Sequence, residues 1–288
     1  MKFKGIILAG GLGSRLNPMT KSVNKHLLPI FDKPLIFYPL SILMLSEITD
    51  ILIIVNKDDI NLYKKLLGNG SRFGIKLTYK IQEKPSGIPE AFNIGKDFIK
   101  NSNVALILGD NFFYGQGLSE LLISSKKKFK GAKIFCYKVK NPNDFGVALI
   151  KNKKIVSLKE KPKKTKSDLA ISGLYFFDKS VTKFSNKLTK SKRNETEIID
   201  LLNIYLKKNK LNYHILGRGA AWLDTGTPEG VFEAGSFVYN LEKRQGFKIA
   251  CLEEISFSKN WINKIQLKKS IKFYGNSPYS KYLQSLIK

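Results

Sequence analysis

The residues of this chain best suited to chemistry begin with a glycine-rich turn near the N-terminus. An apolar run at residues 5–9 is typical of a buried strand, and three glycines follow it within residues 10–13. Glycines let backbone N–H groups approach an anion without a Cβ in the way. The cations Arg15 and Lys25 come shortly afterwards and could hold a polyphosphate. The glycine spacing matches neither a P-loop nor Gly-x-Gly-x-x-Gly, so a plain strand-to-helix turn is the alternative for this segment alone.

Two aspartates are the candidates for binding a metal ion. Asp110 follows an apolar run at residues 104–108, and Asp224 lies in a Trp-Leu-Asp-Thr-Gly segment. Mg²⁺ on nucleotide phosphates typically takes one or two protein carboxylates, so this pair would serve if the fold brought it together. For either aspartate alone, a turn or a helix cap is the alternative. The two histidines and two cysteines are scattered and show no zinc-site spacing.

The pattern of the first half predicts the scaffold that must position these residues. Strand-like apolar runs alternate with helical patterns, which predicts a doubly wound, mostly parallel sheet with helices on both faces. Ligands of such sheets bind beyond the carboxyl ends of the strands, where the glycine turn, Gln82 and Asp110 all fall. The expected strands are 5–9, 51–55, 77–81 and 104–108, and the expected helices are 34–45, 58–67 and 89–98.

The second half is richer in strand patterns and ends in helices. We expect a helix at 227–244, with Thr225 or Thr227 able to cap it. No Pro/Gly/Ser-rich linker, repeat or low-complexity tract divides the chain, which predicts one composite domain with a C-terminal helical appendage. The other expected elements are strands at 132–139, 146–150, 155–159, 171–177, 213–215 and 221–223 and a helix at 194–208.

Composition narrows the functional class. The net charge of +27 suggests nucleic acid as a partner, but the lysines are spread through the chain and no aromatic-interleaved basic patch appears. We therefore expect a solvated, lysine-rich surface and no nucleic-acid partner. No run of about 18 apolar residues and no basic-then-apolar leader occurs, so we expect a cytoplasmic protein without membrane contact.

Several motifs of the first forty residues occur together. They are Gly-Gly-Leu-Gly-Ser-Arg-Leu at 10–16, Pro18, Thr20, Lys25, Leu-Leu-Pro at 27–29, Lys-Pro at 33–34 and Tyr-Pro-Leu at 38–40. In this combination the chain resembles the sugar-1-phosphate nucleotidyltransferases. The likeness continues through Asp224 to about Glu254, and the last thirty residues match poorly.

The resemblance implies a Rossmann-like nucleotidyltransferase fold over residues 1–288. Its parts would be a nucleotide-binding part at 1–130, a β-rich sugar-phosphate-binding part at 131–226 and the helical appendage at 227–288. It further implies Mg²⁺ as cofactor, a homotetramer, and transfer of a thymidylyl group from dTTP to glucose 1-phosphate, giving dTDP-glucose. The alternatives are uridylyl or cytidylyl transfer to another sugar 1-phosphate, and a nucleotide-sugar sensor without catalysis.

The resemblance also assigns the site residue by residue. A glutamine amide donates and accepts at once, which suits the imide edge of thymine or uracil and agrees with Gln82 lying near the base. The catalytic residues would be Arg15, Lys25 and Lys161, and the metal ligands Asp110 and Asp224. The nucleotide would contact Leu8, Gly10, Gly11, Gly13, Arg15, Lys25, Gln82, Pro85, Gly87 and Asp110, and the sugar phosphate would contact Gly146, Glu160, Lys161, Ile171, Tyr175 and Arg193.

Some positions depart from the family pattern. His26 stands where glutamine is frequent, Phe145 replaces a tyrosine and Leu149 a glutamate, while Asn194 and Ile199 alter the run that begins at Arg193. These changes do not involve the residues expected to bind phosphate or metal, and they leave the identity of the sugar open.

A second nucleotide site is implied by the same family. In close members it lies at a subunit interface, and Tyr114–Gly115, Arg218 and residues 245–254 resemble segments that contribute to it. A helix end packed on the core is the alternative for these segments.

Overall fold

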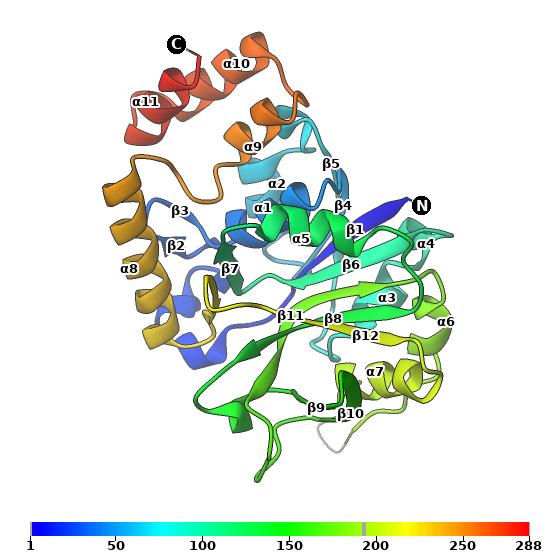
Figure 1. Ribbon diagram of the computed structural model, residues 1–288. Helices are drawn as coiled ribbons and strands as arrows, with labels where there is room; N and C mark the ends of the chain where they lie inside the picture. Colours follow the sequence, from blue (N-terminus) through cyan, green and yellow to red (C-terminus); the bar gives the residue numbers. More distant parts are fainter. Residues whose placement is uncertain (1, 192–193, 288) are drawn as a thin grey trace.

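The computed structural model describes residues 2–191 and 194–287, and its centre is a mixed sheet (Figure 1). Four parallel strands form one side of this sheet in the order β6-β1-β4-β5, with β5 at its edge. Ile6 is aligned with Leu52 on one side and with Leu106 on the other. The four strands are β1 (Phe3–Ala9), β4 (Asp50–Val55), β5 (Lys76–Ile81) and β6 (Asn103–Leu108). The predicted parallel sheet is confirmed.

Helices cover both faces of the sheet, and each face has its own apolar core. Strands with near-continuous apolar sequence need this, because their side chains are buried on both sides. One core contains side chains of α1 (Phe37–Leu45), α2 (Ile60–Leu67), α5 (Leu118–Ser125) and α9 (Leu252–Ser258). The other contains side chains of α3 (Glu90–Ile94), α4 (Lys96–Ile99), α6 (Val181–Ser185) and α7 (Ile198–Lys207).

The second half of the chain extends the sheet with antiparallel strands. β11 pairs antiparallel with the parallel strand β6, so the two halves share one sheet. The β9–β10 hairpin lies at one end of the molecule in Figure 1, opposite the C-terminal helices. The added strands are β8 (Ala132–Lys138), β9 (Val147–Lys151), β10 (Lys154–Lys159), β11 (Leu169–Phe177) and β12 (Leu211–Ile215).

A separate two-stranded sheet joins β7 (Asn111–Gly115) to β13 (Ala220–Asp224). The small hairpin of β2 (Pro29–Ile30) and β3 (Lys33–Pro34) packs beside α8 (Pro228–Gln245). Thr227 caps α8 by accepting a hydrogen bond from the backbone of Gly230 at 3.2 Å, so the second of the two expected caps is the correct one.

The C-terminal appendage is helical, as expected. α10 (Lys264–Tyr274) and α11 (Pro278–Ser285) pack against each other around a small core of their own with the segment at Cys251. Within residues 2–191 and 194–287, no helix is long and apolar enough to cross a membrane.

Three expected helices have different bounds. The helix expected from residue 34 begins at Phe37 because Lys33 and Pro34 form β3. The helix expected at 89–98 is divided into α3 and α4 at Gly95. The helix expected from residue 194 begins at Ile198, because Glu197 is extended. Apolar spacing continues through these segments, so the pattern alone does not reveal where the backbone leaves the helix.

Candidate active site

A cavity of about 350 Å³ lies beyond the carboxyl ends of β1, β5 and β6, as predicted for this sheet. Both halves of the chain line it. The predicted site residues that line it are Leu8, Gly11, Arg15, Lys25, Gln82, Pro85, Gly87, Asp110, Gly146, Glu160, Lys161, Ile171, Tyr175 and Asp224. Gly10 and Gly13 belong to the same turn and are not among the lining residues. Arg193 lies outside the described residues.

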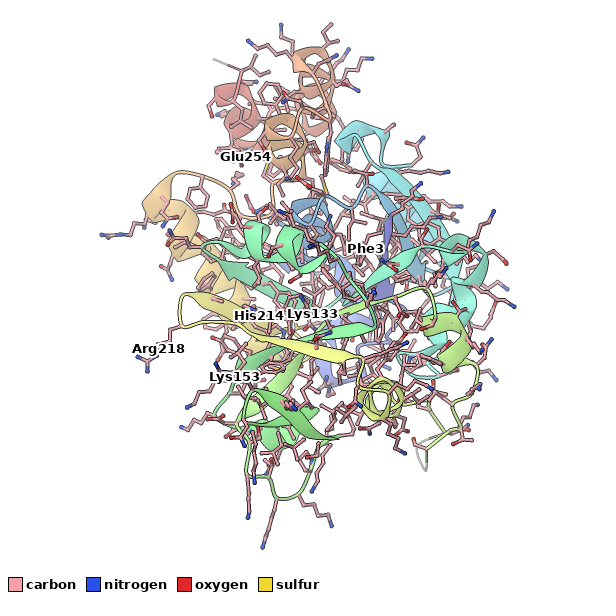
Figure 2. The ribbon with its side chains drawn as sticks, turned by 45° about the vertical axis from the view of Figure 1, so that its right-hand side comes forward. Phe3, Lys133, Lys153, His214, Arg218 and Glu254 are labelled. Atoms are coloured by element: carbon pink, nitrogen blue, oxygen red, sulfur yellow. The ribbon has the colours of Figure 1, made fainter. Side chains whose placement is uncertain are left out.

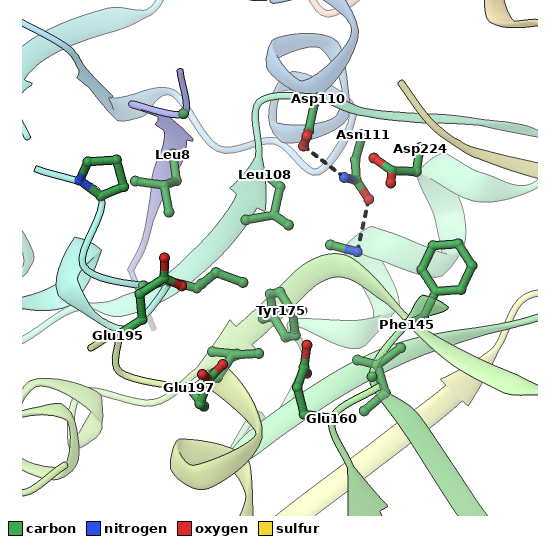
Figure 3. A pocket seen from close by; sticks show the side chains of 18 of the residues that line it. Leu8, Leu108, Asp110, Asn111, Phe145, Glu160, Tyr175, Glu195, Glu197 and Asp224 are labelled. Carbon is green, nitrogen blue, oxygen red and sulfur yellow. Dashed lines mark hydrogen bonds between the residues drawn. The ribbon is translucent and has the colours of Figure 1, made fainter. Parts of the chain in front are cut away.

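The two aspartates are brought together by the β7–β13 sheet. Its register aligns Asp224 with Asn111, next to Asp110. Thr225 extends the connection, since its backbone N and Oγ1 donate to the carbonyl oxygen of Asp110 at 3.1 and 2.7 Å. Asp110, Asn111 and Asp224 therefore gather at one end of the cavity, with Glu160 and Glu197 at the other (Figure 3).

The two carboxyl groups differ in their electrostatic surroundings. Burial alone would raise the pKa of Asp110. The adjacent Lys25 ammonium and the hydrogen bonds from Lys25 and Asn111 have the larger effect, and they lower the pKa of Asp110 to about 2. Burial and the neighbouring charge of Asp110 raise the pKa of Asp224 to about 6, against the opposing charges of Lys25 and Arg15. A second cation near Asp224 would relieve this repulsion, so the pair fits a divalent metal ion.

Two glycines of the site leave room for the ends of neighbouring polar side chains. A Cβ on Gly10 would collide with Oε1 of Gln82, whose side chain lies over the glycine turn. A Cβ on Gly226 would lie 2.5 Å from Nη2 of Arg15, so Gly226 gives the guanidinium room beside Asp224. The glycine turn and the Asp224 segment therefore bring the amide of Gln82 and the guanidinium of Arg15 into one cavity.

The opposite side of the cavity is built from β9–β11. The backbone N of Ile171 donates to the carbonyl of Gly146 at 2.7 Å, and that of Lys161 donates to the carbonyl of Phe145 at 3.1 Å. A Cβ on Gly146 would lie 3.1 Å from Oε2 of Glu160, so the glycine leaves space for this carboxylate. Lys161 and Glu160 thus offer a cation and an acceptor to one ligand.

Phe145 contributes an apolar wall to the same region. Its ring centroid lies 5.1 Å from that of Trp222, at an interplanar angle of 59°. Both residues line the cavity. A ligand hydroxyl facing Phe145 would meet a carbon surface there.

The loop that precedes α7 forms one wall of the cavity, next to residues 85–87. Thr196 donates from its backbone N and its Oγ1 to the carbonyl of Ser86, at 2.9 and 3.0 Å. These bonds hold residues 195–197 against residues 85–87, and both segments line the cavity.

Sequence reasoning missed Asn111 and Trp222 as parts of the site. Asn111 is 3% exposed, and its Oδ1 accepts from Nε1 of Trp222 at 2.6 Å and from the backbone N of Gly173 at 3.0 Å. Its Nδ2 donates to Asp110 Oδ1 at 3.1 Å. Its position directly after Asp110 was the available signal, but its partners come from strands whose pairing the sequence does not reveal.

A second cavity, of about 260 Å³, lies between α1, α5 and α9. It brings together Tyr114, Gly115, Lys248 and Glu254, which the sequence grouped as a second site. Arg218 does not line this cavity, and Figure 2 shows it projecting away from the body of the molecule, far from Glu254.

The arrangement of the first cavity suits a reaction of phosphates. Arg15, Lys25 and Lys161 could neutralise anionic groups, and two adjacent carboxylates could hold a metal ion with them. His26 is a weak candidate for a general base, because burial and the Lys25 charge lower its pKa to about 3. The geometry therefore favours catalysis by alignment and charge stabilisation.

Comparison with known proteins points in the same direction. A family model described as "Nucleotidyl transferase" matches residues 4–240. A glucose-1-phosphate thymidylyltransferase of Neisseria meningitidis is 48% identical over 286 residues, covering 99% of each chain. Its counterpart in Mycolicibacterium smegmatis is 46% identical over 288 residues, again covering 99% of each. Both alignments extend over the last thirty residues, which lie beyond the part of the chain that the family model matches.

Solved structures extend the comparison. A protein of Bacillus anthracis, provisionally named a glucose-1-phosphate thymidylyltransferase and solved in complex with a sucrose, is 40% identical and superimposes with a TM-score of 0.76. The alignment covers 82% of this chain and 94% of that one. A UDP-glucose pyrophosphorylase complexed with UDP-glucose shares the fold at 23% identity, with a TM-score of 0.73 and coverages of 84% and 100%.

Proposed function

The chain belongs to the nucleotidyl transferase family, and from that premise we propose that it transfers a thymidylyl group from dTTP to glucose 1-phosphate, forming dTDP-glucose and pyrophosphate. One observation of this structure supports the proposed reaction in addition to family membership. A single cavity holds Arg15 and Lys25 beside the adjacent carboxylates of Asp110 and Asp224, and Lys161 lines the same cavity. This arrangement suits two phosphorylated substrates that meet end to end.

In the proposed reaction, a phosphate oxygen of glucose 1-phosphate attacks the α-phosphorus of dTTP. The new P–O bond forms as the bond to the β-phosphate breaks, and pyrophosphate leaves with the electron pair. The nucleophile is already an anion, so no side chain has to remove a proton. Arg15 and Lys25 would bind the triphosphate, while Lys161 and Arg193 would bind the sugar phosphate. Their main contribution is to align two anions that repel each other.

Members of this family generally use a divalent metal ion, and we propose Mg²⁺ for this chain. Asp110 and Asp224 fit the role, because the raised pKa of Asp224 marks a buried carboxyl pair short of positive charge. When bound, the ion would neutralise charge on the phosphates. Lys25 pairs with Asp110 in the free enzyme and would be available to the triphosphate once the ion occupies the carboxylates.

We propose that the base of the nucleotide lies against Gln82, Pro85 and Gly87. The Gln82 amide can both donate to and accept from an imide edge, which thymine and uracil share. Choice of dTTP over UTP would then depend on the 5-methyl group and the missing 2′-hydroxyl, and a pocket rejects an added hydroxyl only modestly. Uridylyl transfer is therefore the second candidate.

We also propose that the chain forms a homotetramer with a further nucleotide site at a subunit interface. The second cavity supports this, since it contains Tyr114, Lys248 and Glu254 and would need Arg218 from another copy. Light scattering at working concentration should give four times the monomer mass. A monomer would rule out the interface site.

The catalytic proposal is tested by pyrophosphate release. We expect rapid release with Mg²⁺, glucose 1-phosphate and dTTP, slower release with UTP, and little with ATP or GTP. Omitting glucose 1-phosphate should abolish it, which controls for hydrolysis. Absence of release with every nucleotide, and with other sugar 1-phosphates, would contradict the proposal.

A further inference from the structure

Asn24 has no role in the site described above, yet its side chain is buried and fully engaged beside Lys25. It is 9% exposed and begins the short 3-10 turn at Lys25–Leu27. Its Oδ1 accepts three hydrogen bonds of 2.9 Å, from the backbone N of His26, from Nδ1 of His26 and from the hydroxyl of Tyr63. Its Nδ2 donates to Oδ2 of Asp59 at 2.6 Å.

These partners fix the orientation of the Asn24 amide. A backbone N–H can only donate and a carboxylate can only accept, so the amide oxygen faces His26 and the amino group faces Asp59. The same argument fixes the imidazole. Because an amide oxygen only accepts, Nδ1 of His26 carries the ring proton, and Nε2 carries the lone pair.

The charge of His26 follows from its surroundings. The residue is 2% exposed and lines the active-site cavity next to Lys25. Burial, with the Lys25 charge, lowers its pKa to about 3, so the ring is neutral at pH 7. The cavity is thus lined beside Lys25 by an uncharged histidine held in one tautomer.

The network also anchors the turn to a rigid part of the fold. Asp59 directly precedes α2, and its Oδ2 accepts a second hydrogen bond from Nδ2 of Asn56, at 3.3 Å, just after β4. Tyr63 lies within α2 and is completely buried. The backbone that carries Lys25 is therefore tied through one side chain to the β4–α2 connection.

We propose that Asn24 is a positioning residue for nucleotidyl transfer: it holds the turn that carries Lys25 and keeps His26 in the Nδ1–H form. Lys25, and not His26, is then the cation that this turn presents to the triphosphate. Asn24 touches no substrate and acts through its two neighbours. The proposal rests on the proposed function, since it concerns the placement of Lys25 during that reaction.

The test combines kinetics with the tautomer of His26. We expect Asn24→Ala to lower kcat by about 10²-fold, the loss that a 1 Å displacement of a reacting group can cause. Asn24→Ser should lose less, because a serine can still cap the turn by accepting from the backbone of His26. Tyr63→Phe is the matched control: it removes one donor to the same oxygen, keeps both other bonds, and should leave kcat at the wild-type value.

The tautomer is read from ¹⁵N spectra of histidine-labelled protein without substrate. The chain has two histidines, so a His214→Gln variant assigns the signals of His26. The wild type should show a protonated Nδ1, and both Asn24→Ala and Asn24→Ser should shift protonation towards Nε2. A merely structural role would lower stability without moving these signals.

All rates are normalised to the folded fraction, measured by circular dichroism. The proposal is overturned if Asn24→Ala keeps the wild-type kcat, or if the Nδ1–H signal of His26 survives in it. Asn24→Ser decides the question by the same two readouts if the alanine variant does not fold. A wild type without pyrophosphate release would refute the proposed function itself, and the substrate-free spectra would still report the tautomer.

Discussion

Replacing Lys25 by methionine should affect stability and catalysis in separable ways. Lys25 and Asp110 are paired with side chains only 10% and 15% exposed, so removing the ammonium leaves a buried carboxylate facing Asp224. Breaking such a buried pair costs about 3–5 kcal/mol, because the remaining charge is uncompensated. Loss of a cation that stabilises transition-state charge costs about 10²–10³ in kcat. Lys25→Met should therefore unfold at a lower temperature and turn over far more slowly.

Mg²⁺ separates the two effects. The ion can replace the missing positive charge beside Asp110 and Asp224, so it should raise the melting temperature of Lys25→Met more than that of the wild type. It should not restore kcat, because the triphosphate still lacks its ammonium. Melting is followed by circular dichroism and turnover by pyrophosphate release, with Lys21→Met, an exposed lysine of the same region, as control. Wild-type melting and turnover of Lys25→Met would refute this reasoning.

Three further outcomes follow from the site and its scaffold. Burial and the charge of Asp110 raise the pKa of Asp224 to about 6, so below pH 6 a proton competes with the metal ion for this carboxylate. The Mg²⁺ affinity measured by calorimetry should therefore be constant above about pH 6 and fall about tenfold per pH unit below it. A flat affinity from pH 7 to pH 5 would contradict the assignment. Gly146→Ala should raise KM for glucose 1-phosphate with little change for dTTP, because its Cβ would press on Glu160; equal changes in both KM values would argue against a sugar-side role. Thr227→Ala should lower the free energy of unfolding by about 1 kcal/mol through loss of the α8 cap, as measured by urea denaturation; an unchanged midpoint would mean that the cap contributes nothing.

The sequence was sufficient for the parts of the fold that depend on local pattern. The apolar runs at 51–55 and 104–108 predicted buried parallel strands, and both pair in parallel with the first strand. Residues at strand ends, such as Gln82 and Asp110, were correctly expected to meet at one site, because parallel strands present their carboxyl ends at one edge.

What the sequence could not provide depends on contacts distant along the chain. Nothing local in residues 111–115 indicates that β7 pairs with β13, yet this pairing places Asp224 beside Asp110. Similarly, the apolar spacing from residue 194 predicts a helix, but the backbone N of Thr196 donates a hydrogen bond to the carbonyl of Ser86, in a loop distant along the chain. Here tertiary hydrogen bonds override the local pattern. The role of Asn111 could not be predicted for the same reason, because its partners Gly173 and Trp222 are distant along the chain.

The most direct test of the central claim follows the atoms of the reaction. Glucose 1-phosphate labelled with ¹⁸O at the non-bridging phosphate oxygens would be incubated with dTTP, Mg²⁺ and enzyme, and the products examined by ³¹P NMR. If its phosphate attacks the α-phosphorus, the α- and β-phosphorus signals of dTDP-glucose both show the isotope shift, and pyrophosphate shows none. Label in pyrophosphate, or nucleotide consumption without dTDP-glucose, would contradict the account.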